Sequence, residues 1–317
     1  MSEVPADWLR PLGQTGLTVS MICAGGGPLG SMPGNFGYEV PADRGIETVR
    51  RILRGPITFL DTSNNYSGGE SERRIGAVLA ETGGVPEGFV LATKIDRDAG
   101  NKFPAARVRR SLEESLERLG MERIPLLYLH DPEHVSFEEG MADGGPVGEM
   151  LRIRDEGLAL HLGVAGGPVD LLRRYVATGA FEALITHNRY TLVDRSAGEL
   201  IDFAHGRGVA VVNAAVLGGG ILAKGTAGSS RYAYREAPAE VVAAVAAMEE
   251  ACARHGVPLG AAAVQFSTRD PRIASTIVGF SRPERVDEVV AQASWPIPDE
   301  LWGELEALTP PATTWLN

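Results

Sequence analysis

The chain of 317 residues has little cysteine and no long apolar run. Its two cysteines, Cys23 and Cys252, lie far apart and neither has metal-binding spacing around it, which excludes a disulfide framework. No apolar stretch approaches the ~18 residues that a membrane span requires. Residues 1–10 also lack the apolar core of a signal peptide. From these absences we expect a cytoplasmic protein with two buried, unpaired cysteines.

Basic residues are in the minority as well. The chain has 30 Lys and Arg against 41 Asp and Glu, which gives a net charge of -11. The acidic residues are scattered, so we expect neither a nucleic-acid surface nor binding to an anionic membrane. Hydrophobic residues make up 44%, which at this length is enough to bury roughly three quarters of the unfolded surface. Because no flexible linker separates two cores, we expect one domain over residues 1–317.

Short apolar runs alternate with amphipathic helical patterns along the chain. Eight runs predict strands, at residues 21–24, 57–60, 89–93, 126–129, 160–164, 183–186, 209–213 and 275–278. Most are followed by a helical pattern, as in parallel βαβ units, and eight strands are the number that closes a barrel. We therefore expect an α/β fold, a (β/α)8 TIM barrel. An open doubly wound sheet is the alternative, because alternation alone does not exclude it.

Local signals place several helix ends. Apolar residues at helical spacing over 108–119 predict a helix that Gly120 terminates, and a shorter pattern over 75–79 ends at Gly83. Asp194 is a candidate N-cap for a helix that carries Leu200 and Ile201 and stops at Gly206 or Gly208.

Two segments are predicted to close the barrel at its ends. The stretch LGQTGLTVS, residues 12–20, has a Thr-Gly turn between two short segments and predicts a β-hairpin that plugs one end. Residues 223–236 form the longest stretch without periodicity, and we expect a loop over the functional site there.

Three consecutive predicted strands each end on a titratable side chain. Asp61 ends the second strand, Lys94 the third and His130 the fourth, while Tyr66 stands on the loop five residues after Asp61. In a parallel barrel the carboxyl ends of all strands open on the same rim, where active sites are built. We therefore expect these four side chains to converge.

Such a cluster suits proton transfer to or from a hydroxyl or carbonyl oxygen. A tyrosine with a pKa of about 10 is a poor acid–base group at neutral pH, but a nearby ammonium lowers that pKa. An aspartate keeps the lysine charged, and a histidine orients the substrate oxygen. Because proton transfer alone moves no electrons, a hydride source is also needed, and this predicts a nicotinamide cofactor.

The motifs FLDTSNNYSGGESERRIG, ATK and LLYLHDPE resemble, in this order, the Asp, Tyr, Lys and His signatures of the aldo-keto reductases. The opening LGQTGLTVSMICAGGGPLG is also similar to theirs, and the resemblance covers essentially the whole chain. It implies a (β/α)8 barrel with NADP or NAD lying across the rim. It also implies that Tyr66 is the acid–base residue, that Asp61 and Lys94 tune it, and that His130 orients the substrate.

The same resemblance implies where the cofactor binds. In the family, the segment after the eighth strand (here VGFSRPERVDEVV) holds the adenosine end, and the segment after the seventh (here NAAVLGGGIL) embraces the pyrophosphate. The implied cofactor-binding residues are His187, Leu217, Gly218, Gly220, Gly279, Ser281, Arg285 and Glu288. Ser281 and Glu284, with Pro283 between them, also match a capping box, which predicts a helix N-terminus suited to phosphate.

The chain departs from the common family pattern around the nicotinamide. Ala214 replaces a tyrosine that stacks on the ring in many members, GVAGG at 163–167 replaces a frequent Ser-Asn pair, and His187 stands where glutamine is usual. At the adenosine end, Val289 replaces a frequent asparagine, and Gly279 stands where some NADP-specific relatives have a lysine. The choice between NADP and NAD therefore stays open.

Two further motifs are interpreted as chance matches to known binding motifs. Gly25, Gly27 and Gly30 match G-x-G-x-x-G, but loop residues follow them where a Rossmann motif requires a helix. The segment HDPEH at 130–134 offers two histidines and two carboxylates. Pro132 marks a turn there and no second cluster supplies the missing ligands, so we expect no metal.

The substrate prediction depends on the segments YLHDPE and HNRYTLVD. They look most like the branch of aldose 1-dehydrogenases and pyridoxal dehydrogenases, which oxidise a cyclic hemiacetal to a lactone. We expect NAD(P)+-dependent oxidation at C1 of an aldose such as L-fucose, L-galactose or D-arabinose. Polar loop side chains suit such a substrate, namely Asn64, Asn65, Asn188 and Arg189.

Three other functions stay open on the sequence. One is a general reductase of carbonyl compounds, and another is a reductase-like regulatory subunit that binds cofactor without turnover. The third is a metal-dependent hydrolase that would use His130, Asp131 and His134. The oligomeric state is not indicated.

Overall fold

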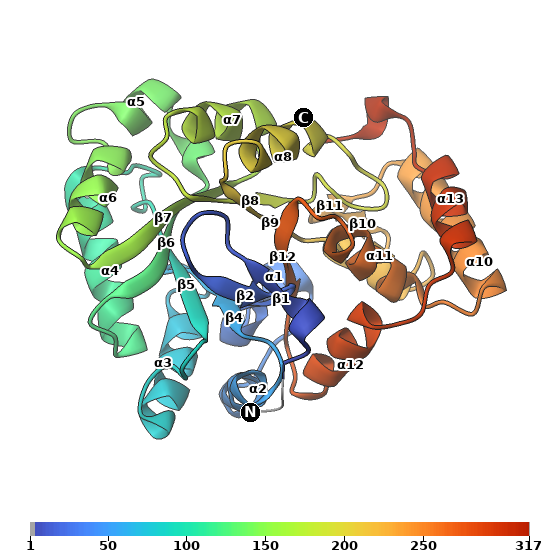
Figure 1. Cartoon of the computed structure of the whole chain (residues 1–317), viewed down its shortest axis with the longest axis horizontal. Helices are drawn as coiled ribbons and strands as arrows, with labels where there is room; N and C mark the ends of the chain where they lie inside the picture. Colours follow the sequence, from blue (N-terminus) through green and yellow to red (C-terminus); the bar gives the residue numbers. More distant parts are fainter. Residues whose placement is uncertain (1–3, 317) are drawn as a thin grey trace.

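The computed structural model describes residues 4–316, in which eight parallel strands form a closed barrel (Figure 1). The barrel strands are β3 (Ile22–Gly25), β4 (Phe59–Asp61), β5 (Val90–Ile95), β6 (Ile124–His130), β7 (Ala159–Gly166), β8 (Ala183–His187), β9 (Ala210–Ala214) and β12 (Ile273–Gly279). Each pairs with its neighbour in the sequence order, and β12 closes the ring against both β9 and β3. The predicted barrel is confirmed, the open sheet is excluded, and all eight strands lie within two residues of their predicted ends.

The strands are apolar on both faces because each face is buried against a different partner. On β6, Leu126 and Tyr128 belong to the cluster inside the barrel, whereas Leu127 and Leu129 belong to the cluster between strands and helices. Alternate side chains of a strand point to opposite faces, which produces this division. The barrel is therefore a packed core, and only its rims are free to bind a ligand.

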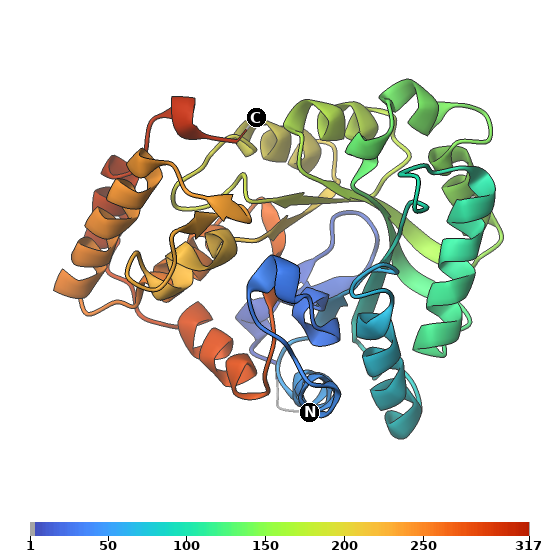
Figure 2. The same cartoon turned by 180° about the vertical axis from the view of Figure 1, so that it is seen from behind.

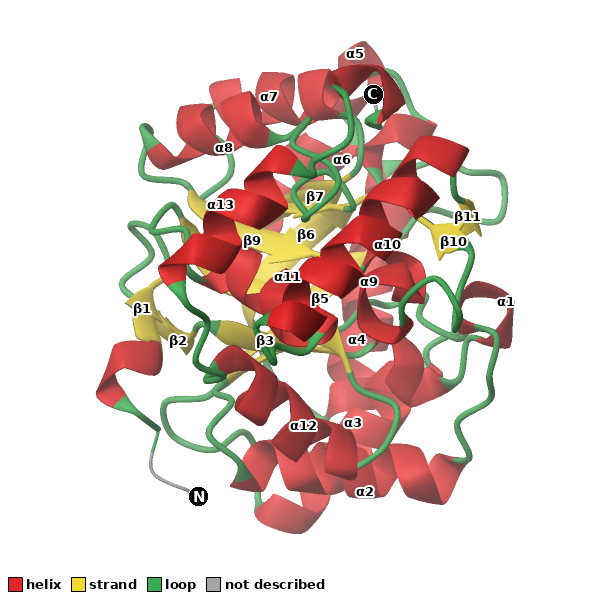
Figure 3. Cartoon of the chain, turned by 90° about the vertical axis from the view of Figure 1, so that its right-hand side faces the viewer, coloured by secondary structure: helices red, strands yellow, loops and turns green. Residues whose placement is uncertain are grey.

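Helices surround the strands on the outside of the barrel (Figure 3). The longer ones are α2 (Ala42–Arg54), α3 (Glu70–Thr82), α4 (Ala105–Leu119), α6 (Pro146–Asp155), α7 (Val169–Ala177), α8 (Gly198–His205), α10 (Ala239–Arg254), α11 (Leu259–Thr268), α12 (Glu284–Ala293) and α13 (Asp299–Ala307). The short ones are α1 (Pro33–Phe36), α5 (Phe137–Met141) and α9 (Ile221–Lys224). Helices α10, α11 and α13 share a second apolar cluster beside the barrel.

Two predicted helix ends are confirmed. Helix α4 ends at Gly120, with φ 66°, and α3 ends at Gly83, with φ 78°. Both values lie in the left-handed region, which glycine adopts without the steric cost that a Cβ imposes.

The two predicted side-chain caps are wrong. Helix α8 begins at Gly198, too far from Asp194 for it to be the N-cap. Asp194 instead accepts hydrogen bonds from Ser196 and from the backbone of Leu316, so it fastens the C-terminal segment. Helix α12 begins at Glu284 and has no side-chain cap. A capping box requires that glutamate three positions inside the helix, so Ser281 cannot form one.

The predicted hairpin closes the amino-terminal end of the barrel. Strands β1 (Leu9–Pro11) and β2 (Thr18–Ser20) pair antiparallel. Leu12 and Val19, from the hairpin, are fully buried in the cluster inside the barrel. Figure 2, seen from behind, shows the opposite rim, with α1 and the loops that follow the strands. One end is thus plugged, and the other is left for a site.

The segment predicted as a loop, 223–236, is partly regular. It contains the end of α9 and a small hairpin of β10 (Arg231–Tyr232) and β11 (Arg235–Glu236). At the turn, the ring of Tyr234 lies 6.5 Å from that of Phe36, centroid to centroid. Both residues line the large cavity, so the segment does lie over the site.

Within residues 4–316 the structure contains no helix that combines the length and the apolar composition of a bilayer span. The signal-peptide prediction partly concerns residues 1–3, which lie outside the described residues.

Candidate active site

The three predicted residues around Tyr66 meet at one nitrogen. The Lys94 Nζ atom, on β5, donates hydrogen bonds to Asp61 Oδ2 at 2.6 Å and to the Tyr66 hydroxyl oxygen at 3.1 Å. It also donates to the backbone carbonyl of Thr62 at 2.7 Å. Asp61 and Lys94 are each only 2% exposed, so this ion pair is held away from bulk water. The structure therefore brings Asp61, Tyr66 and Lys94 together as the sequence predicts.

The charges in this cluster act differently from our expectation. Burial is the largest single influence and would lower the pKa of Lys94, but Asp61 and Tyr66 together outweigh it and raise the pKa, so the amine is a cation at neutral pH. Burial raises the pKa of Tyr66 well above its ordinary value, and Lys94 offsets only part of the rise. The prediction that the phenol has a lowered pKa is wrong as a net effect. The free-energy cost of desolvating the phenolate exceeds the stabilisation that the Lys94 ammonium provides. Tyr66 is therefore a protonated phenol at neutral pH.

His130, at the end of β6, is held by a network that sequence reasoning missed. Its Nδ1 atom lies 2.7 Å from Asp96 Oδ1 and 3.1 Å from the hydroxyl of Ser63. Its ring faces that of Tyr66 edge-on, with centroids 5.6 Å apart. With Nδ1 occupied, Nε2 is the nitrogen left to meet a substrate oxygen.

Asp96 carries a charge beside the imidazole. Burial is the largest single influence and would raise the Asp96 pKa, but His130 and the hydrogen bonds from Ser63 and Asn65 together lower the pKa to about 2. In return, Asp96 raises the pKa of His130 against the opposing effect of burial. A signal for Asp96 was present in the sequence. It is a carboxylate two residues after Lys94 and directly after the end of β5, and therefore lies on the same rim.

A cavity of about 820 Å³ opens on this rim and contains all four predicted catalytic residues. This volume lies within the range of ~300–1,000 Å³ that is usual for ligand sites. Six predicted cofactor residues also line it, namely His187, Leu217, Gly220, Gly279, Ser281 and Arg285. Gly218 and Glu288 do not. Gly218 packs beneath Tyr232, whose ring a Cβ at this glycine would approach to 2.7 Å.

The end of the cavity after β12 is basic. Arg282 and Arg285 both line it, and Glu288 pairs with them at 2.7 Å and 3.4 Å. Arg282 was missed by sequence reasoning although it lies within the SRPER motif. Guanidinium groups bind phosphate with two parallel hydrogen bonds. The basic end, the glycines after β9 and the proton-transfer cluster together fit a nicotinamide dinucleotide.

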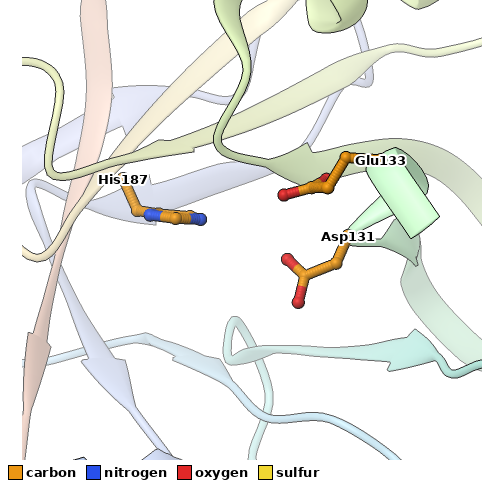
Figure 4. Close-up of side chains that lie close together, drawn as sticks. All are labelled: Asp131, Glu133 and His187. Atoms are coloured by element: carbon orange, nitrogen blue, oxygen red, sulfur yellow. The ribbon is translucent and has the colours of Figure 1, made fainter. Parts of the chain in front are cut away.

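A second cluster contradicts part of the metal interpretation. Asp131, Glu133 and His187 place one ligand atom each within 4.8 Å of one another (Figure 4). The reasoning that no other residue joins the HDPEH segment was wrong, because β8 carries His187 to the rim beside the turn after β6. Burial lowers the pKa of His187 to about 4, so its imidazole is neutral at pH 7.

Residues 22–310 match the family model described as the aldo/keto reductase family. The chain belongs to this family. As a member, it is an NAD(P)-dependent oxidoreductase of the kind that the sequence predicted, and the hydrolase interpretation is discarded.

Similar proteins lie in the predicted branch. An L-galactose dehydrogenase from Arabidopsis thaliana is 32% identical over 317 residues, covering 97% of this chain and 96% of that protein. A D-threo-aldose 1-dehydrogenase from a Pseudomonas species is 33% identical, covering 86% and 90%. A solved aldo-keto reductase from Bacillus halodurans, in its holo form, has a TM-score of 0.77 at 21% identity and covers 97% of each chain. It shares the barrel fold.

Proposed function

We propose that the protein oxidises the C1 hemiacetal of an aldose, with Tyr66 as the acid–base residue and NAD+ or NADP+ as the hydride acceptor. The observation that carries this proposal is the Tyr66 hydroxyl held 3.1 Å from Lys94 in the cavity at the rim. The names of the relatives from Arabidopsis thaliana and the Pseudomonas species support an aldose as substrate.

The reaction divides between the cofactor and the side chains. A nicotinamide bound in the cavity would supply the acceptor for the hydride at C1 of the sugar. The C1 hydroxyl loses its proton to the Tyr66 oxygen, and the C–O bond becomes the carbonyl of a lactone. Lys94 stabilises the phenolate that must accept this proton, and the His130 Nε2 atom orients the reacting oxygen. In reduction, the same phenol returns the proton to a carbonyl oxygen.

The raised pKa of Tyr66 gives this proposal a pH signature. A protonated phenol is ready to donate, so reduction is favoured at neutral pH. Oxidation needs the phenolate, so its rate should rise with pH over the alkaline range. This feature also supports the second candidate function, a general carbonyl reductase, for which donation by Tyr66 is the only proton transfer required.

Tyr66 would lie beside the nicotinamide of a bound cofactor, and the basic end of the cavity would hold its adenosine. Leu217, Gly220 and Gly279 would pack against the cofactor, and Ser281 and Arg285 would contact the 2′-phosphate of the adenosine where the cofactor carries one. Arg282 supplies a second guanidinium, while Glu288 partly neutralises both. This balance of charge supports use of either NADP or NAD.

A substrate panel in both directions tests the function. Purified protein is incubated with NAD+ or NADP+ and L-galactose, L-fucose or D-arabinose between pH 7 and 10, and the formation of reduced cofactor is followed at 340 nm. We expect oxidation that increases with pH. Efficient reduction of aromatic aldehydes with no oxidation of any sugar would contradict the proposal and leave the carbonyl reductase.

A further inference from the structure

The wall of the cavity beside His130 carries more hydrogen-bond acceptors than the described residues satisfy. Asp131 lies 3.8 Å from His130 Nε2 through one oxygen and 3.8 Å from Arg97 through the other, both beyond hydrogen-bonding distance. The carboxylate of Glu133 accepts a long bond of 3.4 Å from the backbone of Gly167. An ionised carboxylate accepts about four hydrogen bonds. These two carboxylates are therefore able to receive several donors from a ligand.

His187 adds a donor to the same wall. Its Nδ1 atom lies 3.1 Å from the amide nitrogen of Asn188, which can only donate. That contact makes Nδ1 the acceptor and assigns the proton of the neutral ring to Nε2. In Figure 4 the ring of His187 extends toward Asp131 and Glu133. The wall thus offers carboxylate acceptors and an imidazole donor within 4.8 Å of one another.

Two glycines make the room for this arrangement. A Cβ at Gly166 would lie 2.9 Å from Glu133 Oε2, and one at Gly167 would lie 3.3 Å from a carbon of the His187 ring. A side chain at Gly166 would therefore displace the carboxylate. Gly166 falls in the GVAGG segment, where the family frequently has a Ser-Asn pair, so the departure that removes an amide from the rim also admits Glu133.

We propose that Asp131, Glu133 and His187 form a subsite that binds the hydroxyl groups of the sugar ring remote from C1. This subsite rests on the proposed function and explains how a polyhydroxylated substrate would be selected. Its acceptors lie next to the histidine that orients the reacting oxygen, within reach of the rest of a sugar ring. A bound substrate without hydroxyl groups would displace water from these two carboxylates without replacing its hydrogen bonds, which is costly.

A divalent cation fits the wall less well than hydroxyl groups. The cluster supplies only three ligand atoms, and Arg97 stands 3.8 Å from one of the carboxylates. Arg189 also acts electrostatically on Glu133, so positive charge is already present on this wall. Hydroxyl groups bring donors without adding positive charge, and arginines can donate to their oxygens.

The test compares two substrates in the full-length protein. Asp131→Asn and Glu133→Gln keep the shape of each side chain and remove the charge. For each variant, kcat/KM is measured for L-galactose oxidation and for benzaldehyde reduction. We expect the ratio of the sugar value to the aldehyde value to fall ~10- to 100-fold, as expected for loss of hydrogen bonds to a charged group. The fall should appear mainly in the KM for the sugar.

Two further variants separate recognition from general damage. Asp143→Asn changes a fully exposed carboxylate away from the cavity, and it should leave the ratio unchanged. Gly166→Ala keeps both carboxylates but crowds Glu133, and it should lower the ratio as Glu133→Gln does. Thermal unfolding of each variant shows whether the fold is intact.

Three other outcomes would contradict the subsite, and they differ in whether they also contradict the proposed function. If the wild-type protein oxidises no sugar, the proposed function fails and the subsite fails with it. If it oxidises sugars but the ratio is unchanged in Asp131→Asn and Glu133→Gln, only the subsite is overturned. Loss of sugar oxidation on dialysis against EDTA, restored by Mn²⁺ or Zn²⁺, would make the cluster a cation site and would also overturn the subsite.

Discussion

The two halves of the barrel rim differ in what their strand ends supply. From β4 to β6, the ends carry Asp61, Lys94 and His130, and each of these side chains is held by a charged partner. From β7 to β12, three of the four barrel strands end in a small residue, namely Gly166, Ala214 and Gly279, and β8 ends in His187. The first half holds the side chains to which we assign proton transfer. The second half provides space for a ligand, and we expect it to decide specificity.

Removing the phenol should have the largest effect. In Tyr66→Phe we expect kcat to fall by at least ~100-fold, the usual scale for loss of a general acid–base group. Binding of NADPH, followed by its fluorescence, should persist because the residues at the far end of the cavity are unchanged. Retained turnover would identify another proton donor and remove Tyr66 from the first half's chemistry.

Removing the lysine should be nearly as damaging. In Lys94→Met, the cation that opposes the rise in the Tyr66 pKa is gone, so the pH at which oxidation begins should move upward. The variant also leaves Asp61 buried without its partner, which costs about 3–5 kcal/mol of stability. The double variant with Asp61→Asn should recover stability but not activity. An unchanged pH profile in an active variant would disprove the coupling of Lys94 to Tyr66.

A smaller effect is expected from the residue that positions His130. In Asp96→Asn, kcat should fall roughly 10- to 100-fold, because small misplacements of a catalytic group have effects of this size. The His130 pKa, which Asp96 raises, should fall, so an NMR titration of the imidazole should shift to lower pH. A loss of activity without that shift would indicate general damage to the fold.

The second half can be probed through stability. The pKa of His187 is lowered to about 4 in the folded protein, against about 6.5 for an unfolded chain. Between these values the unfolded state binds a proton that the folded state refuses, so stability falls as the pH decreases from 6.5 to 4. We expect roughly 2 kcal/mol of this loss to be absent in His187→Gln. Urea unfolding at pH 7 and pH 4.5 measures the loss of unfolding free energy in each protein. An equal loss in the wild type and in His187→Gln would show that the His187 imidazole is exposed to water.

The adenosine end should show the smallest and most selective effect. In Arg285→Ala we expect NADPH to bind roughly 10-fold more weakly, with little change for NADH, because only NADPH carries a 2′-phosphate. Arg282→Ala is the matched variant, since both arginines pair with Glu288. Equal weakening of both cofactors would place Arg285 elsewhere on the dinucleotide.

The sequence predicts the strand ends of the first half of the rim better than it predicts the contacts and pKa values around them. Asp61, Lys94 and His130 were predictable because each directly follows an apolar run, and parallel strands end on one rim. The net pKa of Tyr66 was not, because it depends on how completely the phenol is desolvated, which no spacing in the chain encodes. Asp96 was not predicted, because it lies just after β5 ends and its contact with His130 depends on the spacing between neighbouring strand ends.

The sequence alone determined the eight strands, the barrel that they close and the candidate catalytic residues that converge on its rim, because these follow from local patterns and from the rule that parallel strand ends converge. Tertiary structure alone decided the neighbours across the rim. Asp131 and Glu133 meet His187 although more than fifty residues separate them in the chain. It also decided the absence of both predicted side-chain caps. Such contacts depend on the distances between elements once they are packed, and a linear pattern carries no such distances.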